Sequence, residues 1–469
     1  MKTSMIWGAL ALCLGTGFAQ EDYTTWGRVK TLTLNTSSTG ANLTENTGNF
    51  PLLVRLDSTH AEVFQQSKTG GADLRFRRVT GPQLPYYIAS WDSAARKAEI
   101  WVSVDTVFAN NANQFIRMYW QKASATAASS AAGVFSPAKG FVAAWNMGGA
   151  TGARANYVTG GVTARPTNDR TGGTYTGRSV PGVIGTADSL AGGVGLNDAG
   201  GLGGGEHFDV APMPTFEGGF TLSMWANVTS TTNRTWMRFF DFGNGEAADN
   251  IFAGRVGTET NVRFDVLPTG LPVAGAIVLN QWKHFTFTAD AAGMMNAFLD
   301  GVSAGTMEGG MISPAERASS FLGKSNWPGD AYFTGLMDEV QVSGTGRSPA
   351  WAKLAYATQR PGANLLTWST SGPGSSVLPG VAARSLRIRR QGANYVFELP
   401  SAGSEARLTV TDMSGRRVWS RSIGRTETRV AWNGANASGS AAARGTYVAR
   451  LEVLNGNAPA WEGTIAHVR

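Results

Sequence analysis

Apolar and polar residues alternate along most of this chain in pieces as long as a β-strand. In the first part such pieces recur about every 10 to 15 residues, a spacing typical of antiparallel sandwiches. They are "FPLLVRL" (50–56), "ADLRFRRV" (72–79), "LPYYIASW" (84–91), "AEIWVSV" (98–104) and "QFIRMYW" (114–120). No convincing amphipathic helix separates them, so the pattern predicts a β-sandwich over residues 22–122.

A second β region is expected over residues 139–362. Strands are indicated at "FTLSMWANV" (220–228), "WMRFFDFG" (236–243), "NVRFDVL" (261–267), "QWKHFTFTAD" (281–290), "MNAFLDG" (295–301) and "GLMDEVQV" (335–342). The pair Asp300 and Gly301 predicts a tight hairpin turn, which needs positive φ. One helix is predicted in "SPAWAKLAYATQ", with Ser348 as its N-cap and Pro349 at its first position.

A third β region follows a linker rich in Ser, Gly and Pro, "STSGPGSSVLPG" (369–380). It covers residues 384–469 and has hairpin-like turns at "SG" (414–415) and "NG" (433–434). A stretch of small residues, "KASATAASSAAG" (122–133), is expected to link the first two regions. The fold class is therefore all-β, with three modules.

The N-terminus has the pattern of an export signal. Lys2 precedes an apolar run, and small residues at positions 17 and 19 suit a cleavage site, so residues 1–19 are predicted to be a signal peptide. A lipoprotein signal around Cys13 is a weaker alternative, because Leu12 is bulky where a small residue is wanted. We expect a secreted or outer cell-surface protein without a transmembrane segment after signal removal. Cys13 is the only cysteine, so the mature chain has no disulfide.

The formal net charge of +7 is concentrated at the C-terminal end. Residues 384–469 contain 13 arginines, no lysine and six acids. Such a module could contact nucleic acid or an acidic glycan. However, its arginines follow strand-like alternation and are not clustered with aromatic residues, which is typical of a solvated β surface. We therefore predict no nucleic-acid partner.

The adjacent acids Asp338 and Glu339 are the main candidates for catalysis, since paired carboxylates cleave glycosidic bonds. Neighbouring side chains of a strand point to opposite faces, so these two are not expected to line one cleft. The spacing Glu-x-Asp-x-x-Glu, a zinc motif of histidines and a Gly-x-Ser-x-Gly elbow are all missing. We therefore expect a protein that is not an enzyme, with a divergent glycoside hydrolase as a remaining hypothesis.

Three resemblances to known families rest on these segments. "QWKHFTFTADAAGMMNAFLDG" and "FTGLMDEVQVSGTGRSPAWAKLAYATQR" resemble the laminin-G-like, concanavalin A-like jelly rolls of secreted bacterial proteins. "FPLLVRL", "GADLRFRR" and "LPYYIASWD" are similar to domain of unknown function 2341. "VTDMSGRRV", "AWNGANASG" and "GTYVARLEV" resemble the immunoglobulin-like C-terminal domains that sort proteins for type IX secretion, although flagellar hook-cap sandwiches share these signatures.

The jelly-roll resemblance implies a possible role for Asp338 as a Ca²⁺ ligand, with Asn168 and Asp169 of "TNDRTGG" as partners. A buried structural acid is the alternative for Asp338. The resemblance also implies that the helix after Ser348 closes the jelly roll. From the residues themselves, Trp327 and Tyr332 in a Pro/Gly loop are candidate sugar-binding aromatics, with plugging of the sandwich end as the alternative.

The leading functional hypothesis is an exported, non-catalytic surface protein that binds a polysaccharide or other glycan through its jelly roll. A structural or protein-binding role at the cell surface is the second hypothesis. The C-terminal module is expected to engage the secretion machinery or to anchor the protein.

Overall fold

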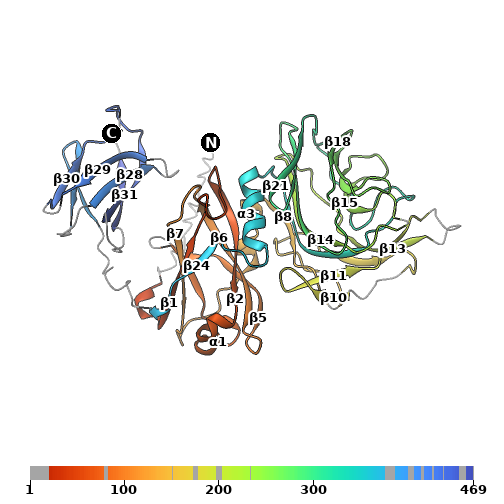
Figure 1. Ribbon diagram of the computed structural model, residues 1–469, viewed down its shortest axis with the longest axis horizontal. Coiled ribbons are helices and arrows are strands. Elements are labelled where there is room, and N and C mark those ends of the chain that lie inside the picture. The colour runs from red at the N-terminus through yellow and green to blue at the C-terminus, as the bar shows by residue number, and fades with distance from the viewer. Residues whose placement is uncertain are drawn as a thin grey trace, which may run out of the picture.

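The computed structural model confirms the all-β fold class (Figure 1). It describes residues 21–78, 83–149, 151–172, 178–196, 203–232, 234–374, 386–399, 406–412, 417–424, 427–436, 438–453 and 461–467. The predicted signal peptide lies outside these residues. In the described part, no helix is long and apolar enough to cross a bilayer.

The N-terminal module is a sandwich of two antiparallel sheets. One sheet has the order β24-β1-β7-β3-β4 with β25 also paired to β1, and the other has the order β2-β6-β5. The bounds are β1 Arg28–Leu34, β2 Thr47–Leu56, β3 Arg75–Arg77, β4 Gln83–Leu84, β5 Tyr86–Asp92, β6 Lys97–Val107, β7 Gln114–Trp120, β24 Leu366–Trp368 and β25 Gly372–Pro373. Two short helices are α1 Ala61–Gln66 and α2 Ala131–Val134, and 3₁₀ turns cover Tyr23–Thr25, Ser58–His60, Thr69–Gly71 and Pro137–Lys139.

Strands β24 and β25 follow the jelly roll in the chain yet complete the N-terminal sheet. Leu32 of β1 pairs with Trp368 of β24, and Arg28 pairs with Pro373 of β25. The jelly roll is therefore inserted into the N-terminal sandwich, between β7 and β24. The ranges predicted from sequence for the two modules, 22–122 and 139–362, both leave out β24 and β25.

Helix α3 (Pro349–Gln359) begins as predicted, because the Ser348 side chain accepts a hydrogen bond from the Trp351 N–H. Its expected role as the closing helix of the jelly roll needs correction. Trp351, Leu354 and Ala355 are buried in the core cluster of the N-terminal sandwich. The helix thus lies between the two modules (Figure 1) and seals the N-terminal one.

The jelly roll consists of two eight-stranded antiparallel sheets. The back sheet has the order β10-β11-β23-β14-β19-β20-β21 with β8 paired to β23, and the front sheet has the order β12-β13-β22-β15-β16-β17-β18 with β9 paired to β13. The back strands are β8 Phe141–Trp145, β10 Arg178–Pro181, β11 Thr186–Leu190, β14 Phe220–Val228, β19 Trp282–Ala289, β20 Met295–Leu299, β21 Val302–Met307 and β23 Gly335–Ser343. The front strands are β9 Arg165–Asn168, β12 Gly193–Val194, β13 Gly204–Asp209, β15 Arg238–Gly243, β16 Ile251–Arg255, β17 Val262–Val266, β18 Thr269–Val273 and β22 Ser319–Leu322.

Alternating side chains of both sheets form one aromatic-rich core, in which Phe239, Phe240, Phe285 and Phe287 are buried. The predicted hairpin between β20 and β21 forms, since Asp300 (φ +51°) and Gly301 (φ +73°) both adopt positive φ. This is the backbone that a two-residue turn of this kind requires.

The C-terminal module has its own core, which includes Phe397, Leu408 and Trp432. One sheet has the order β26-β27-β30 and the other β29-β28-β31-β32. The bounds are β26 Arg387–Gln391, β27 Asn394–Glu398, β28 Ala406–Asp412, β29 Arg417–Ile423, β30 Arg429–Trp432, β31 Gly445–Val453 and β32 Trp461–His467.

The two faces of the jelly roll differ in what covers them. The N-terminal sandwich lies against the back sheet, where Arg55 donates a hydrogen bond to the carbonyl of Val183 and the Trp225 indole N–H of β14 donates one to the Gln359 side chain of α3. Strands β13, β15 and β18 of the front sheet lie on the side away from α3 (Figure 1). The outer face of the front sheet is therefore where a ligand could reach the jelly roll.

Candidate functional site

Two neighbouring rows of side chains cross the centre of the front sheet. Cross-strand pairing places Phe252 of β16 between Asp241 of β15 and Asp265 of β17. In the next row, Gly254 lies between Arg238 and Arg263. In β16 and β17 the members of the two rows are two residues apart and so point the same way. In β15 a bulge between Arg238 and Phe240 lets Arg238, three residues before Asp241, occupy the same face.

Arg238 is the centre of this arrangement although it is almost fully buried. Its guanidinium lies over the rings of Phe252, at 4.4 Å, and Trp327, at 5.5 Å. Its Nη2 forms an ion pair with Asp330 at 2.8 Å. A Cβ on Gly254 would come within 2.8 Å of the Arg238 Cδ, so glycine leaves the space in which this side chain lies.

The loop that carries Trp327 is held down on the sheet by Asp241. The carboxylate of Asp241 accepts hydrogen bonds from the backbone N–H and the side-chain amide of Asn326, both at 2.9 Å. It also accepts one from the Asn250 amide at 2.8 Å. Burial raises the pKa of Asp241, and these three donors counteract that effect.

Trp236 and Trp327 remain half-buried beside this buried framework. The Trp327 ring packs edge-on against Phe252, with ring centroids 5.4 Å apart. Arg263 lies over the Trp236 ring at 5.6 Å, and its side chain is 39% exposed. We call this surface the aromatic face; its members are Trp236, Arg238, Phe252, Arg263, Asp265, Trp327 and Asp330.

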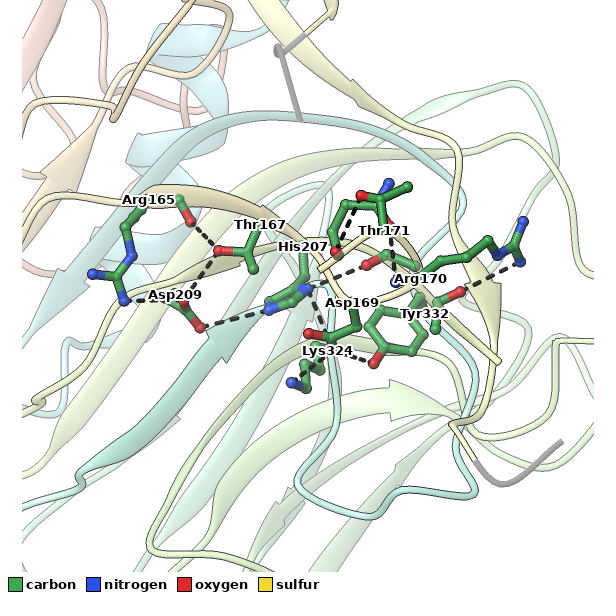
Figure 2. Close-up of polar contacts among 12 residues, drawn as sticks. Arg165, Thr167, Asp169, Arg170, Thr171, His207, Asp209, Lys324 and Tyr332 are labelled. Atoms are coloured by element: carbon green, nitrogen blue, oxygen red, sulfur yellow. Dashed lines mark hydrogen bonds and ion pairs between the residues drawn. The ribbon is translucent and has the colours of Figure 1, made fainter. Parts of the chain in front are cut away.

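A second polar group on the same sheet, the His207 cluster, contains Arg165, Asp169, His207, Asp209, Lys324 and Tyr332 (Figure 2). The buried imidazole of His207 lies between two carboxylates, with Nδ1 3.9 Å from Asp169 and Nε2 3.5 Å from Asp209. Asp169 also forms an ion pair with Lys324 at 2.8 Å and accepts a hydrogen bond from the Tyr332 hydroxyl.

The charges in this cluster stabilise one another. Burial raises the pKa of Asp209, but contacts with His207, Arg165 and Thr167 outweigh burial and hold the pKa below its usual range. Burial likewise raises the pKa of Asp169, and Lys324 and Tyr332 lower it further than burial raises it. Burial and the neighbouring Asp169 raise the pKa of Tyr332. The cluster is thus an ionic network at the edge of the sheet.

The two predicted sugar-binding aromatics fall in different environments. Trp327 belongs to the aromatic face and keeps part of its ring accessible. Tyr332 is only 2% exposed, and its hydroxyl is bonded to Asp169. A ring that is buried to this extent has no free face for stacking, so the ligand role expected of Tyr332 has no support in its position.

Asp338 and Glu339 point to the same side of β23, contrary to the expectation from strand alternation. Between the pairs Trp225 with Asp338 and Ser223 with Gln341, the register shifts by a β-bulge. Glu339 adopts a φ of +47° there. Met337 and Val340, on either side of the acids in sequence, both face the jelly-roll core. A bulge places its two residues opposite one partner and so cancels the alternation.

This acid pair lies under the N-terminal sandwich. Asp338 is fully buried, and its Oδ2 accepts hydrogen bonds from the backbone N–H groups of Val183 and Ile184 at 2.7 and 2.9 Å. Glu339 is 3% exposed. The structure thus gives a substrate no open route to either carboxylate, and Asp338 has the contacts of a structural acid.

The three expected calcium ligands are not brought together. Asp338 lies on the back sheet and turns away from the core, whereas Asn168 and Asp169 lie at the edge of the front sheet. Backbone N–H groups occupy one oxygen of Asp338, and the Lys324 ammonium contacts Asp169. Both surroundings favour a carboxylate paired with hydrogen-bond donors and do not fit a cation. Among the described residues, no group of three or more Asp, Glu, His or Cys side chains could hold a metal ion.

Family models match three parts of the chain. The concanavalin A-like lectin/glucanases superfamily matches residues 202–353, domain of unknown function DUF2341 matches residues 70–146, and the FlgD Ig-like domain matches residues 384–457. The chain thus carries a concanavalin A-like, a DUF2341 and an Ig-like domain, which confirms the first two resemblances. The third is confirmed as immunoglobulin-like, while type IX sorting stays a prediction. No curated protein matches this chain.

Several solved structures are similar to part of this chain. Domain 4 of AbnA, a GH43 extracellular arabinanase from Geobacillus stearothermophilus, in complex with arabinotriose, is 19% identical over 46% of this chain and 98% of its own, with a TM-score of 0.33. The CBM40 of Ruminococcus gnavus IT-sialidase is 15% identical over 38% of this chain and 95% of its own, with a TM-score of 0.28. A SAP-like pentraxin from Limulus polyphemus is 15% identical over 33% and 79%, with a TM-score of 0.26.

Sequence reasoning found Trp327 but missed Trp236, Arg238 and Arg263. Arg263 and Asp265 alternate with apolar residues in "NVRFDVL", a signal that both point outward from one strand. That Arg238 lies between two aromatic rings depends on the pairing of β15, β16 and β17 and on the Trp327 loop. No local pattern encodes those contacts.

Proposed function

We propose that this protein is exported and non-catalytic, and that its jelly roll binds a carbohydrate at the cell surface. One observation carries the proposal: two half-buried indoles, Trp236 and Trp327, flank a fixed arginine on the face of the jelly roll away from the N-terminal sandwich. Aromatic rings stack on the apolar faces of sugars, and a few fixed polar groups beside them give orientation.

The framework of the aromatic face supports this proposal. Arg238 and Asp330 hold the Trp327 loop in place, so the indoles require little ordering on binding. The Nη atoms of Arg263 have no hydrogen-bond partner among the residues the structure describes, and they are available to sugar hydroxyls. Preorganised contacts of this kind lower the entropic cost of binding.

Retention of the mature full-length chain on a panel of insoluble and immobilised polysaccharides tests the proposal. We expect retention on at least one polysaccharide and no release of reducing sugar. Failure to bind any glycan would favour the second hypothesis, a structural or protein-binding component. Sugar release that is lost in Asp338→Asn or Glu339→Gln would instead support a hydrolase. A parallel series with EDTA tests calcium, which stays a prediction.

Export is a separate part of the proposal. It rests on the signal-like N-terminus and on the immunoglobulin-like C-terminal module, for which the secretion machinery is the proposed partner. Cell fractionation of a strain that expresses the whole chain, compared with one that lacks residues 384–469, tests it. We expect the whole chain outside the cell or on its surface and the truncated chain inside the envelope. Equal distribution of both would overturn the sorting role.

A further inference from the structure

The charges on the aromatic face are already matched within the protein. Arg238 forms an ion pair with Asp330 at 2.8 Å, and Arg263 forms one with Asp265, also at 2.8 Å. Asp241, directly beside Phe252, adds a further carboxyl group. The surface between the two indoles thus offers no excess positive charge, although it contains two arginines.

These ion pairs are costly to break. The Arg238 and Asp330 side chains are only 5% and 13% exposed, and Asp265 is 2% exposed. A carboxylate or sulfate at the outer nitrogens of Arg263 would lie beside Asp265, which already compensates the charge of that arginine. To reach Arg238, it would have to displace Asp330, leaving that aspartate buried without its cation. Removing the partner of a buried charge is strongly unfavourable. The two pairs therefore disfavour an anionic ligand at this face.

An uncharged sugar meets no such obstacle. It can stack on the half-buried rings of Trp236 and Trp327 and accept hydrogen bonds from the outer nitrogens of Arg263 while the pair with Asp265 stays intact. All of these contacts leave the internal ion pairs as they are.

We infer that the aromatic face selects an uncharged polysaccharide over an acidic one, and that Asp265 and Asp330 determine this selectivity by neutralising the two arginines. The inference rests on the proposed function. It names the class of glycan and assigns a specificity role to two residues that do not themselves have to contact the sugar.

Affinity electrophoresis of the mature full-length chain tests the inference. The gels would contain uncharged polymers (a glucan, a xylan and an arabinan) or acidic ones (polygalacturonate, alginate and dextran sulfate). We expect the wild type to be retarded by at least one uncharged polymer, with little change when salt is added. Acidic polymers should retard it only weakly, and they should retard the Trp236→Ala/Trp327→Ala variant to the same extent.

The variant Asp265→Asn/Asp330→Asn frees both arginines while keeping the shape of the side chains. We expect a gain in affinity for acidic polymers of about two- to fivefold for each charge freed, lost again at high salt. Asp265→Asn alone serves as a milder variant should the double variant unfold, and thermal unfolding of each protein checks this. Glu308 is an exposed acid, and the Glu308→Asn variant controls for the change in net charge.

The outcomes separate the inference from the function on which it rests. Wild-type binding to an acidic polymer that depends on the two tryptophans would overturn the inference and leave glycan binding intact. The same holds if the Asp265→Asn/Asp330→Asn variant gains no more than the Glu308→Asn control. Absence of binding to every polymer would overturn the proposed function itself.

Discussion

Asp338 and Glu339 are buried side by side between the two modules, and their nearest charged neighbours belong to the N-terminal sandwich. Glu99 adds a third carboxyl group, and Arg55 is the cation, with its Nε 3.8 Å from Glu99. Burial raises the pKa of Asp338 to about 7 and that of Glu339 well above its usual value, because each charged form lacks solvent and faces another acid.

The direction of the resulting pH dependence follows from these shifts. An acid whose pKa is raised by folding keeps its proton in the folded protein while the unfolded chain loses it near pH 4. The free energy of unfolding therefore falls as the pH rises from about 4 toward the folded-state pKa values. This pair contributes most to stability in acid and least above neutral pH.

Glu339→Gln should remove much of this pH dependence. Glutamine fills the same space without an ionisable group, so the variant should unfold at nearly the wild-type temperature near pH 4 and at a higher temperature near pH 8. The difference in the free energy of unfolding should grow as the pH rises. Calorimetry of both proteins over this range measures it.

Glu308→Gln, an exposed acid of the jelly roll, is the matched control and should follow the wild type at every pH. The free energy of unfolding of Glu339→Gln and of the wild type could instead differ by the same amount in acid and above neutral pH. That result would contradict a Glu339 carboxyl group that keeps its proton in the folded protein.

At the scale of elements, α3 and the two strands after it are part of the N-terminal sandwich. Trp351, Leu354 and Leu365 are buried in its core, and β24 and β25 cover the edge of β1. Burying each such side chain contributes about 1.5 to 3 kcal/mol, and together they approach the whole stability of a typical domain.

A fragment of residues 22–122 should therefore fail to fold cooperatively, whereas residues 22–373 should fold. Circular dichroism and thermal melts of the two fragments check this. Within the whole chain, Trp351→Ala should cost about 3 to 5 kcal/mol through loss of packing in this core. A well-folded 22–122 fragment would contradict the inserted arrangement.

The elements that local patterns encode were predictable from the sequence, and those set by distant contacts were not. The N-cap at Ser348 and the turn at Asp300 and Gly301 depend on chemistry within four residues, and both form as expected. The bulge at Glu339 depends on the register between β23 and β14, and the partner of β24 lies more than 300 residues earlier. Alternation alone cannot reveal either.

The candidate site, too, could be predicted only where local sequence determines it. Trp327 could be singled out because a tryptophan in a Pro/Gly loop has little local reason to be buried. Its partnership with Arg238 arises only when the loop folds onto β15 and β16. The expected grouping of Asp338 with Asp169 fails because the aromatic core of the jelly roll separates their two sheets.

At the scale of the whole molecule, the insertion directs ligands to one side of the jelly roll. The N-terminal sandwich contacts the back sheet through Arg55 and α3, and the front sheet on the other side is the surface that we propose as the recognition surface (Figure 1). Export or anchoring by the C-terminal module stays a prediction.

The affinity of three proteins for the polysaccharide that the wild type retains tests this account most directly: the wild type, Trp236→Ala/Trp327→Ala, and Trp282→Ala. Trp282 is a half-buried tryptophan at the end of β19 on the back sheet, which makes it a matched control. The account predicts that affinity falls about tenfold or more in the double variant, because two stacking contacts are lost, and is unchanged in the control. Unchanged affinity in the double variant, or an equal loss in Trp282→Ala, would contradict it.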